Sequence, residues 1–101
     1  MIDLQAVAAE LVLRLRENDF PEDDGVRQVL CVAEEAGEFV GAYRRWKGWA
    51  RRSGPFADVE AELADVILTS YVTAAELGID LDAAIERKLD VVRSRGYRER
   101  K

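Results

Sequence analysis

The chain has 101 residues, of which 49% are apolar and 35% are charged, a composition typical of a soluble helical protein. This length suits one domain with a modest core, so we treat residues 1–101 as a single domain. The formal net charge of -5 argues against a protein that binds nucleic-acid polymers through a broad basic surface.

Several absences bear on location. Cys31 is the single cysteine, so no intrachain disulfide can form, and a reducing compartment is expected. No run of about 18 apolar residues occurs, so no membrane partner is predicted. The sequence begins without the basic start and apolar core of a signal peptide. We therefore expect a cytoplasmic protein.

The first predicted helix covers residues 3–18, with Asp3 as its N-cap. Its apolar side chains recur at three- and four-residue steps: Leu4, Val7, Ala8, Leu11, Val12 and Leu15. A connector marked by Pro21 and Gly25 follows.

The second predicted helix covers residues 26–47 and ends near Gly48. The side chains expected to face inward are Val29, Val32, Ala36, Phe39, Val40 and Tyr43. A basic, glycine-containing loop over residues 48–55 follows this helix.

The third predicted helix begins either with Pro55 at its first position or after Asp58 as an N-cap, and Gly78 is its C-cap. The fourth covers residues 81–94 behind Asp80 as N-cap. The side chains expected to face inward are Val59, Leu63, Val66, Ile67, Ser70 and Ala74, then Leu81, Ala84, Ile85, Leu89 and Val92. No segment shows sustained strand alternation, so we predict an all-α domain, a four-helix antiparallel bundle.

Acidic side chains gather at the border of the apolar stripe on the second and third predicted helices. At about 100° per residue, Glu35 lies nearest the stripe of the second helix, and Glu38 follows at about 60°. Glu62 and Asp65 lie in the same way on the third helix. If these helices are neighbours, the four carboxylates converge, and Mg²⁺ or Mn²⁺ would relieve their repulsion.

Spacing alone leaves a second interpretation open. Acids are common on amphipathic helices, and glutamate is a good helix former. Glu34 and Glu38 fit equally well as solvated side chains or as ion-pair partners of nearby arginines: Arg27, Arg44 and Arg45.

Taken together, the two clusters resemble the signature of the MazG-type all-α nucleoside triphosphate pyrophosphohydrolases. That family carries Glu-Glu-x-x-Glu on one helix and Glu-x-x-Asp on the next, and the matching residues here are Glu34, Glu35, Glu38, Glu62 and Asp65. The stretches 36–39, 62–66 and 78–81 are also similar, and the resemblance covers about residues 26–97. It implies a MazG-like all-α NTP pyrophosphatase architecture and hydrolysis of an NTP or dNTP to the monophosphate and pyrophosphate.

The resemblance also implies roles for these acids. Mg²⁺, or possible Mn²⁺, would be held by Glu35, Glu38, Glu62 and Asp65. Glu34 would position or deprotonate the attacking water, so the catalytic candidates are Glu34, Glu35 and Glu38. Family members are dimers or tetramers with sites near subunit contacts, so a homodimer or homotetramer is expected here.

Basic and aromatic side chains are the candidates for substrate binding. Lys47, Lys88 and Arg95 are expected to contact phosphates, and Trp46 is expected to stack on the base. The same residues also fit a solvated surface, a core or a subunit contact. Val92 stands where family members often carry Asn, a departure that bears on substrate choice.

Two other functions stay open. Phosphoribosyl-ATP pyrophosphohydrolase carries a similar acidic helix, although the basic stretch 44–47 resembles the MazG type more closely. A catalytically inactive helical interaction module is the third interpretation, and Val92 is the residue that favours it.

Overall fold

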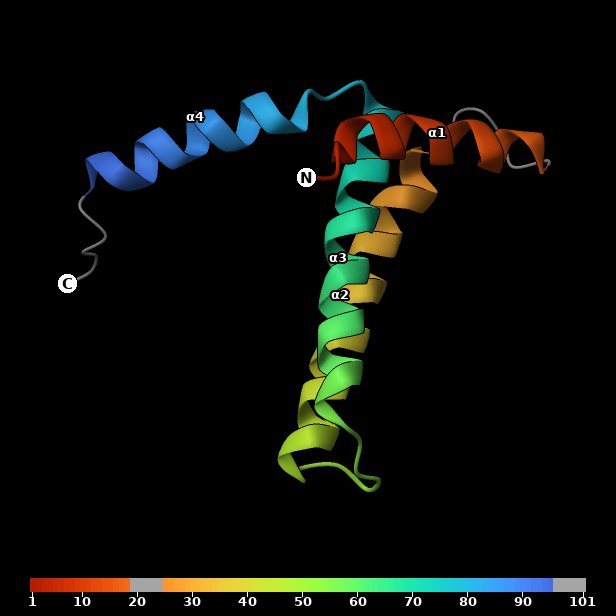
Figure 1. Cartoon of the computed structure of the whole chain (residues 1–101), viewed down its shortest axis with the longest axis vertical. Coiled ribbons are helices and arrows are strands. Elements are labelled where there is room, and N and C mark those ends of the chain that lie inside the picture. The colour runs from red at the N-terminus through yellow and green to blue at the C-terminus, as the bar shows by residue number, and fades with distance from the viewer. Residues whose placement is uncertain (19–24, 96–101) are drawn as a thin grey trace.

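The computed structural model describes residues 1–18 and 25–95, and this part of the chain is all-α (Figure 1). Its four helices are α1 (Leu4–Glu17), α2 (Gly25–Lys47), α3 (Phe56–Leu77) and α4 (Leu81–Ser94). The predicted all-α class and the four helices are confirmed. The predicted connector around Pro21 lies outside the described residues. None of these helices is both long enough and apolar enough to traverse a lipid bilayer.

Short-range signals set most of the helix ends. Asp3 and Asp80 each accept a hydrogen bond from the backbone N–H three residues later, at 3.2 Å and 3.1 Å, so both are N-caps as predicted. Gly48 and Gly78 follow α2 and α3 with φ values of 79° and 72°, a conformation that favours glycine. The predicted ends of these two helices are therefore confirmed.

The start of α3 differs from both alternatives. Pro55 is the residue before the helix, with extended backbone and no side-chain cap, rather than its first helical residue. Asp58 lies in the first turn, so its assignment as the N-cap is wrong. In that position its negative charge favours the helix through the exposed backbone N–H groups of the first turn.

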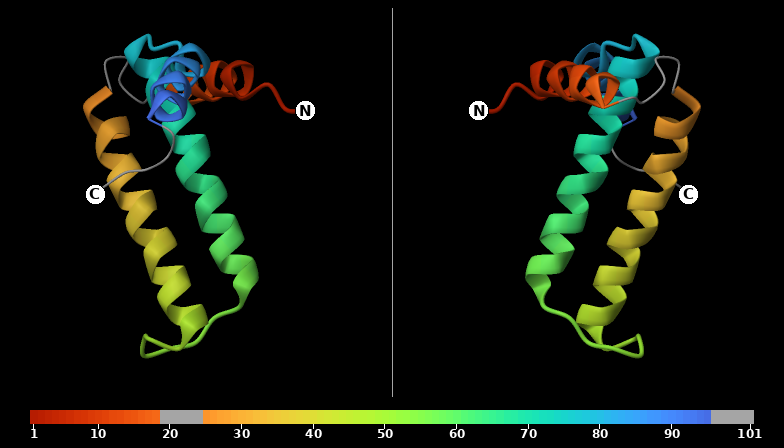
Figure 2. Two further views of the ribbon diagram at one scale, coloured as in Figure 1. Left: turned by 90° about the vertical axis from the view of Figure 1, so that its left-hand side faces the viewer. Right: turned by 90° about the vertical axis from the view of Figure 1, so that its right-hand side faces the viewer.

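The long helices α2 and α3 lie side by side and antiparallel, and the loop 48–55 joins them at one end (Figure 2). Thr73 Oγ1 donates a 3.1 Å hydrogen bond to the carbonyl oxygen of Gln28 and ties the helices together near the other end. There α1 crosses the hairpin and packs on α3. The residues of this core are Ala8, Val12 and Val72, with Leu11, Leu15 and Tyr71 packed around them.

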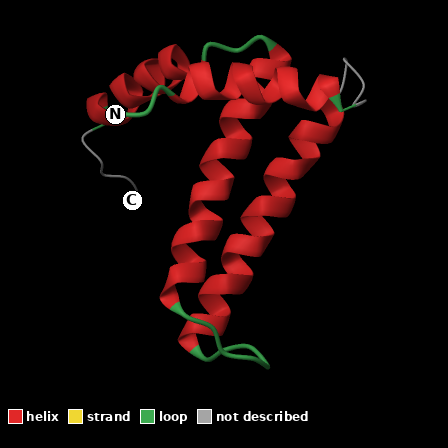
Figure 3. Ribbon diagram, turned by 45° about the vertical axis from the view of Figure 1, so that its right-hand side comes forward, coloured by secondary structure: helices red, strands yellow, loops and turns green. Residues whose placement is uncertain are grey.

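Helix α4 extends away from the α1 end of the hairpin instead of lying along it (Figures 1 and 3). Gln5 Oε1 accepts hydrogen bonds from the backbone N–H groups of Leu81 at 3.0 Å and Asp82 at 3.4 Å. Tyr71 donates a 2.7 Å hydrogen bond to Asp82. These contacts hold the first turn, but no residue of α4 is buried, and Ile85 and Leu89 of its predicted inward face are exposed.

The bundle is therefore open in a single chain. The radius of gyration is 16.4 Å, compared with about 13 Å for a compact domain of this length. Several side chains expected inside remain exposed, including Val40 at 52% and Leu63 at 46%. The physical reason is that two neighbouring helices cover only one side of each other, and α4 does not close the other side.

Candidate metal centre

One face of α2 follows the seam between α2 and α3. Gln28, Glu35 and Ala42 recur every seven residues, which is about two helical turns, so they share this face. Gln28 is 9% exposed and Ala42 is 1% exposed, which marks the face as the one turned toward α3. Glu35 lies midway between them, in the middle of the seam.

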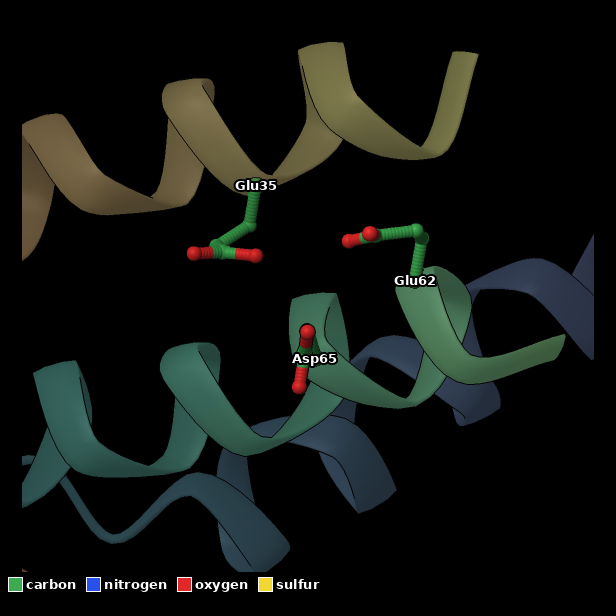
Figure 4. Close-up of side chains that lie close together, drawn as sticks. All are labelled: Glu35, Glu62 and Asp65. Atoms are coloured by element: carbon green, nitrogen blue, oxygen red, sulfur yellow. The ribbon is translucent and has the colours of Figure 1, made fainter. Parts of the chain in front are cut away.

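Three carboxylates from the two helices meet in this seam. Glu35 of α2 and Glu62 and Asp65 of α3 each place one carboxylate oxygen within 4.8 Å of the others. Figure 4 shows Glu35 and Glu62 extending into the space between the helices, with Asp65 beside them. Glu35 and Glu62 are half-buried and Asp65 is exposed, so the group is open to solvent on one side.

Two oxygens of this group have unsatisfied hydrogen-bonding capacity. Glu35 Oε1 and Glu62 Oε1 are buried, and neither has a hydrogen-bond partner within residues 1–18 and 25–95. A buried carboxylate oxygen without a partner destabilises a fold, and most such atoms in proteins are paired. The pair therefore calls for a ligand that is a donor or a cation.

The pKa values of two carboxyl groups in the site are raised, because these groups are partly buried and lie close to other carboxylates. Burial raises the pKa of Glu35 above its ordinary value of 4.5, and neighbouring carboxylates raise that pKa further: Glu38, Asp65, Glu62 and Glu34. Burial is also the largest cause that raises the pKa of Glu62, followed by the charges of Glu38 and Asp65, while the Arg45 guanidinium opposes them. A divalent cation would reverse this effect, because positive charge favours the ionised carboxylates.

The donor set fits a hard cation. All the converging atoms are carboxylate oxygens, which suit Mg²⁺, Mn²⁺ or Ca²⁺ and not a metal that prefers sulfur or imidazole. The convergence expected from helix spacing therefore holds for Glu35, Glu62 and Asp65. The choice of Mg²⁺ or Mn²⁺ stays a prediction.

Two other predicted site residues lie at the edge of this group. Glu38 is exposed, and its carboxylate is not among the three that converge, although its charge raises the pKa of both Glu35 and Glu62. Glu34 is exposed on the outer side of α2 and acts on Glu35 alone of the two. Both acids are accessible to a molecule that approaches from solvent.

Trp46 and Lys47 lie at the far end of α2, where the hairpin turns. The Trp46 ring centroid is 4.9 Å from that of Phe56 and 5.9 Å from that of Tyr43. Lys47 Nζ lies 5.6 Å from the ring centroids of both Trp46 and Trp49. These rings already pack on one another, and the ammonium lies over two of them.

Of the remaining predicted substrate residues, Lys88 lies on α4, and Arg95 is the C-cap that follows this helix. Because α4 extends away from the hairpin, the structure of one chain does not bring these two cations to the carboxylates (Figure 1). Val92 lies on the same helix and is half-buried.

Two polar residues of the seam, Gln28 and Thr69, were not among the predicted site residues. Each stands seven residues from a predicted metal ligand, Gln28 before Glu35 and Thr69 after Glu62. That spacing repeats the facing direction after about two turns, so it was available as a signal. The periodicity did not predict that both residues line a cavity with α1, because that cavity depends on how α1 crosses the hairpin.

Comparison with protein-family models, curated proteins and solved structures gave no match to this chain. The resemblance to the MazG-type enzymes therefore stays a prediction that rests on the motif residues alone.

Proposed function

We propose that this chain is a metal-dependent nucleoside triphosphate pyrophosphohydrolase, which converts an NTP or dNTP to the monophosphate and pyrophosphate. The observation that carries the proposal is the pair of buried, unpartnered oxygens on Glu35 and Glu62 beside Asp65. A purely structural seam gains nothing from these atoms, whereas a site for a divalent cation requires such donors.

The residues that would hold the ion are Glu35, Glu62 and Asp65, and Glu38, whose charge acts on Glu35 and Glu62, is the further candidate. The chemistry that Mg²⁺ or Mn²⁺ supplies when bound is neutralisation of phosphate charge and activation of water. Exposure of Asp65 on the open side of the seam supports access of a triphosphate from that side.

The chemical step needs a base and no covalent nucleophile. A water oxygen would form the new bond to phosphorus, the bond to the bridging oxygen between the α and β phosphates would break, and pyrophosphate would leave. Glu34 would accept the water proton, because it is exposed, beside Glu35 and free of burial. Glu38 is the alternative acceptor on the same helix.

Release of pyrophosphate from a panel of NTPs and dNTPs, with Mg²⁺ or Mn²⁺, tests the proposal. The expected result is pyrophosphate and monophosphate in equal amounts, with no activity in excess EDTA. Phosphoribosyl-ATP is included in the same panel to test the alternative function, phosphoribosyl-ATP pyrophosphohydrolysis. No turnover with any triphosphate, although the protein is folded, would leave the inactive helical module as the better interpretation.

We also propose that the working form is a homodimer or homotetramer. The chain exposes 7489 Å², compared with about 5,800 Å² for a compact protein of its mass. The excess of about 1,700 Å² exceeds the roughly 800 Å² that each partner buries in a standard interface. The apolar face of α4 supports the same idea, since Ile85 is 47% exposed and Leu89 is 37% exposed. Light scattering coupled to gel filtration measures the mass, and a monomer with full activity would contradict this part of the proposal.

A further inference from the structure

A cavity of about 320 Å³ lies where α1 crosses the α2–α3 hairpin. Its lining is apolar from α1 and α3, through Leu11, Leu15, Leu68 and Val72, and polar from Gln28 and Thr69 in the seam. Arg14 and Asn18 also line it. The volume lies at the lower end of the range for small-ligand pockets, roughly 300–1,000 Å³. The cavity therefore suits one small group and not a large ligand.

The cavity continues the seam that holds the carboxylates. Gln28 precedes Glu35 by seven residues, and Thr69 follows Glu62 by seven residues. A seven-residue step along a helix is a rise of about 10 Å on the same face. The polar floor of the cavity is therefore about 10 Å along the hairpin from the carboxylates, a spacing that a nucleotide can bridge between its phosphates and its base.

Gln28 gives this cavity the means to recognise a ligand. Its side chain lines the cavity, the residue is 9% exposed, and its carboxamide makes no hydrogen bond within the described ranges 1–18 and 25–95. Among the described residues, the buried side-chain oxygens and nitrogens without a partner belong to Glu35 and Glu62, so the Gln28 amide atoms are accessible from the cavity and open to pairing with a ligand. An amide offers one acceptor and two donors in a plane, which matches the hydrogen-bonding edge of a nucleobase.

We infer that this cavity is the nucleobase subsite of the proposed enzyme, with Gln28 reading the base and the leucines of α1 and α3 packing on its faces. The inference rests on the proposed function for the identity of the substrate. It replaces the aromatic end of the hairpin as the base site, because the faces of Trp46 and Trp49 already lie under the Lys47 ammonium. The leucine-lined cavity has no such occupant among the described side chains.

The test measures binding of two separate halves of the substrate by NMR on the labelled full chain. Uridine, cytidine, adenosine and guanosine are titrated as phosphate-free probes, and inorganic tripolyphosphate with Mg²⁺ is titrated as the base-free probe. We expect at least one nucleoside to shift the Gln28 side-chain amide and the cavity residues of α1. Tripolyphosphate with Mg²⁺ is expected to shift residues around Glu35 and Glu62 instead.

Substitution of methionine at two positions of the cavity separates the effect of hydrogen bonding from the effect of packing. Gln28→Met removes the amide at similar size, and it should weaken binding of the preferred nucleoside about ten-fold, since a site built to pair a polar edge loses that edge. Leu68→Met keeps an apolar cavity wall and should change nucleoside binding by less than about two-fold. Neither change should alter tripolyphosphate binding. Gln28→Glu is the second variant at this position, and it should shift the base preference because the amide donors are lost.

The outcomes also separate the two proposals. Nucleoside shifts confined to Trp46 and Trp49, equal effects of the two methionine variants, or tripolyphosphate binding with no nucleoside binding would each overturn the base subsite while leaving the metal site standing. Nucleoside binding in the cavity without any triphosphate turnover would support the subsite and contradict the pyrophosphohydrolase.

Discussion

Helices α3 and α4 have the same kind of sequence, an apolar stripe beside charged positions, but different environments. α3 lies between α1 and α2 and buries Val59, Val72 and Ala74. α4 buries no residue, although its apolar residues follow the same three- and four-residue steps. The difference shows that an amphipathic pattern predicts a helix with one face to be buried. The pattern does not predict which surface that face will pack against.

The contrast between α3 and α4 also concerns helix stability. A helix of about 14 residues is marginally stable alone in water. α4 has an N-cap at Asp80, and two of its backbone N–H groups donate hydrogen bonds to Gln5 Oε1, which holds its first turn. The rest of α4 has no buried residue, whereas α3 packs on both α1 and α2.

The largest expected difference between α3 and α4 is in the effect of replacing one aspartate by asparagine on each helix. Asp65→Asn on α3 removes a charged donor of the carboxylate group and should lower pyrophosphate release about 100-fold or more. Asp90→Asn on α4, the matched control, should leave turnover within about two-fold, because this exposed acid is not in the group. Steady-state assays with circular dichroism check both. An Asp65→Asn variant that releases pyrophosphate as fast as the wild type would contradict a role of the α2–α3 hairpin in the proposed reaction.

The converse experiment disturbs α4. Ile85→Asp together with Leu89→Asp puts charges on its apolar face and should raise the dissociation constant of the proposed homo-oligomer about 100-fold, because buried apolar contacts would become desolvated charges. Arg87→Asp places the same charge on the polar face and serves as the control. Analytical ultracentrifugation measures the shift. If the double variant keeps the mass of the wild type, α4 is not the contact surface.

Metal binding should stabilise the hairpin through the buried oxygens of Glu35 and Glu62. Mg²⁺ at about 100 times its dissociation constant should raise the free energy of unfolding by about 2.7 kcal/mol. Glu62→Gln should lose most of this gain, whereas Glu60→Gln, an exposed acid on the same helix, should keep it. Urea unfolding with and without the ion measures the difference. Equal gains in the two variants would place the ion elsewhere.

The smallest expected effect is a dependence on pH in the absence of metal. Folding raises the pKa of Glu62 above 4.5, so the unfolded chain releases this proton first, and stability falls as pH rises from about 4.5 toward 7. The difference in unfolding free energy between wild type and Glu62→Gln should therefore shift in favour of the variant over this range. Thermal melts at several pH values measure it. A shift in the other direction would mean that Glu62 is stabilised as a carboxylate.

Local sequence was enough for the helix ends and for part of the site. Capping side chains and left-handed glycines act within a few residues, so Asp3, Asp80 and Gly78 could be assigned from the sequence alone. The convergence of Glu35 with Glu62 also followed from helix angles, once the two helices were taken as neighbours. These features depend on geometry that one or two helices determine.

Features that depend on a third helix were not predictable in the same way. The direction of α4 depends on contacts from Gln5, which is 76 residues earlier in the chain than Leu81. The cavity over Gln28 depends on where α1 crosses, and no periodicity records that crossing. The exposure of Glu38 reflects a position about 60° from Glu35, a small angle that decides whether a side chain faces the seam or the solvent.

The unpartnered oxygens of Glu35 and Glu62 place the stability of the hairpin in conflict with its proposed activity. Replacement of both acids by methionine or leucine would remove two buried polar atoms and their mutual repulsion, so the hairpin should become sturdier toward heat while becoming inert. Laboratory selection for thermal endurance alone would be expected to discard these acids. These two acids therefore destabilise the fold locally, in the stretch of the seam where the proposed chemistry requires them.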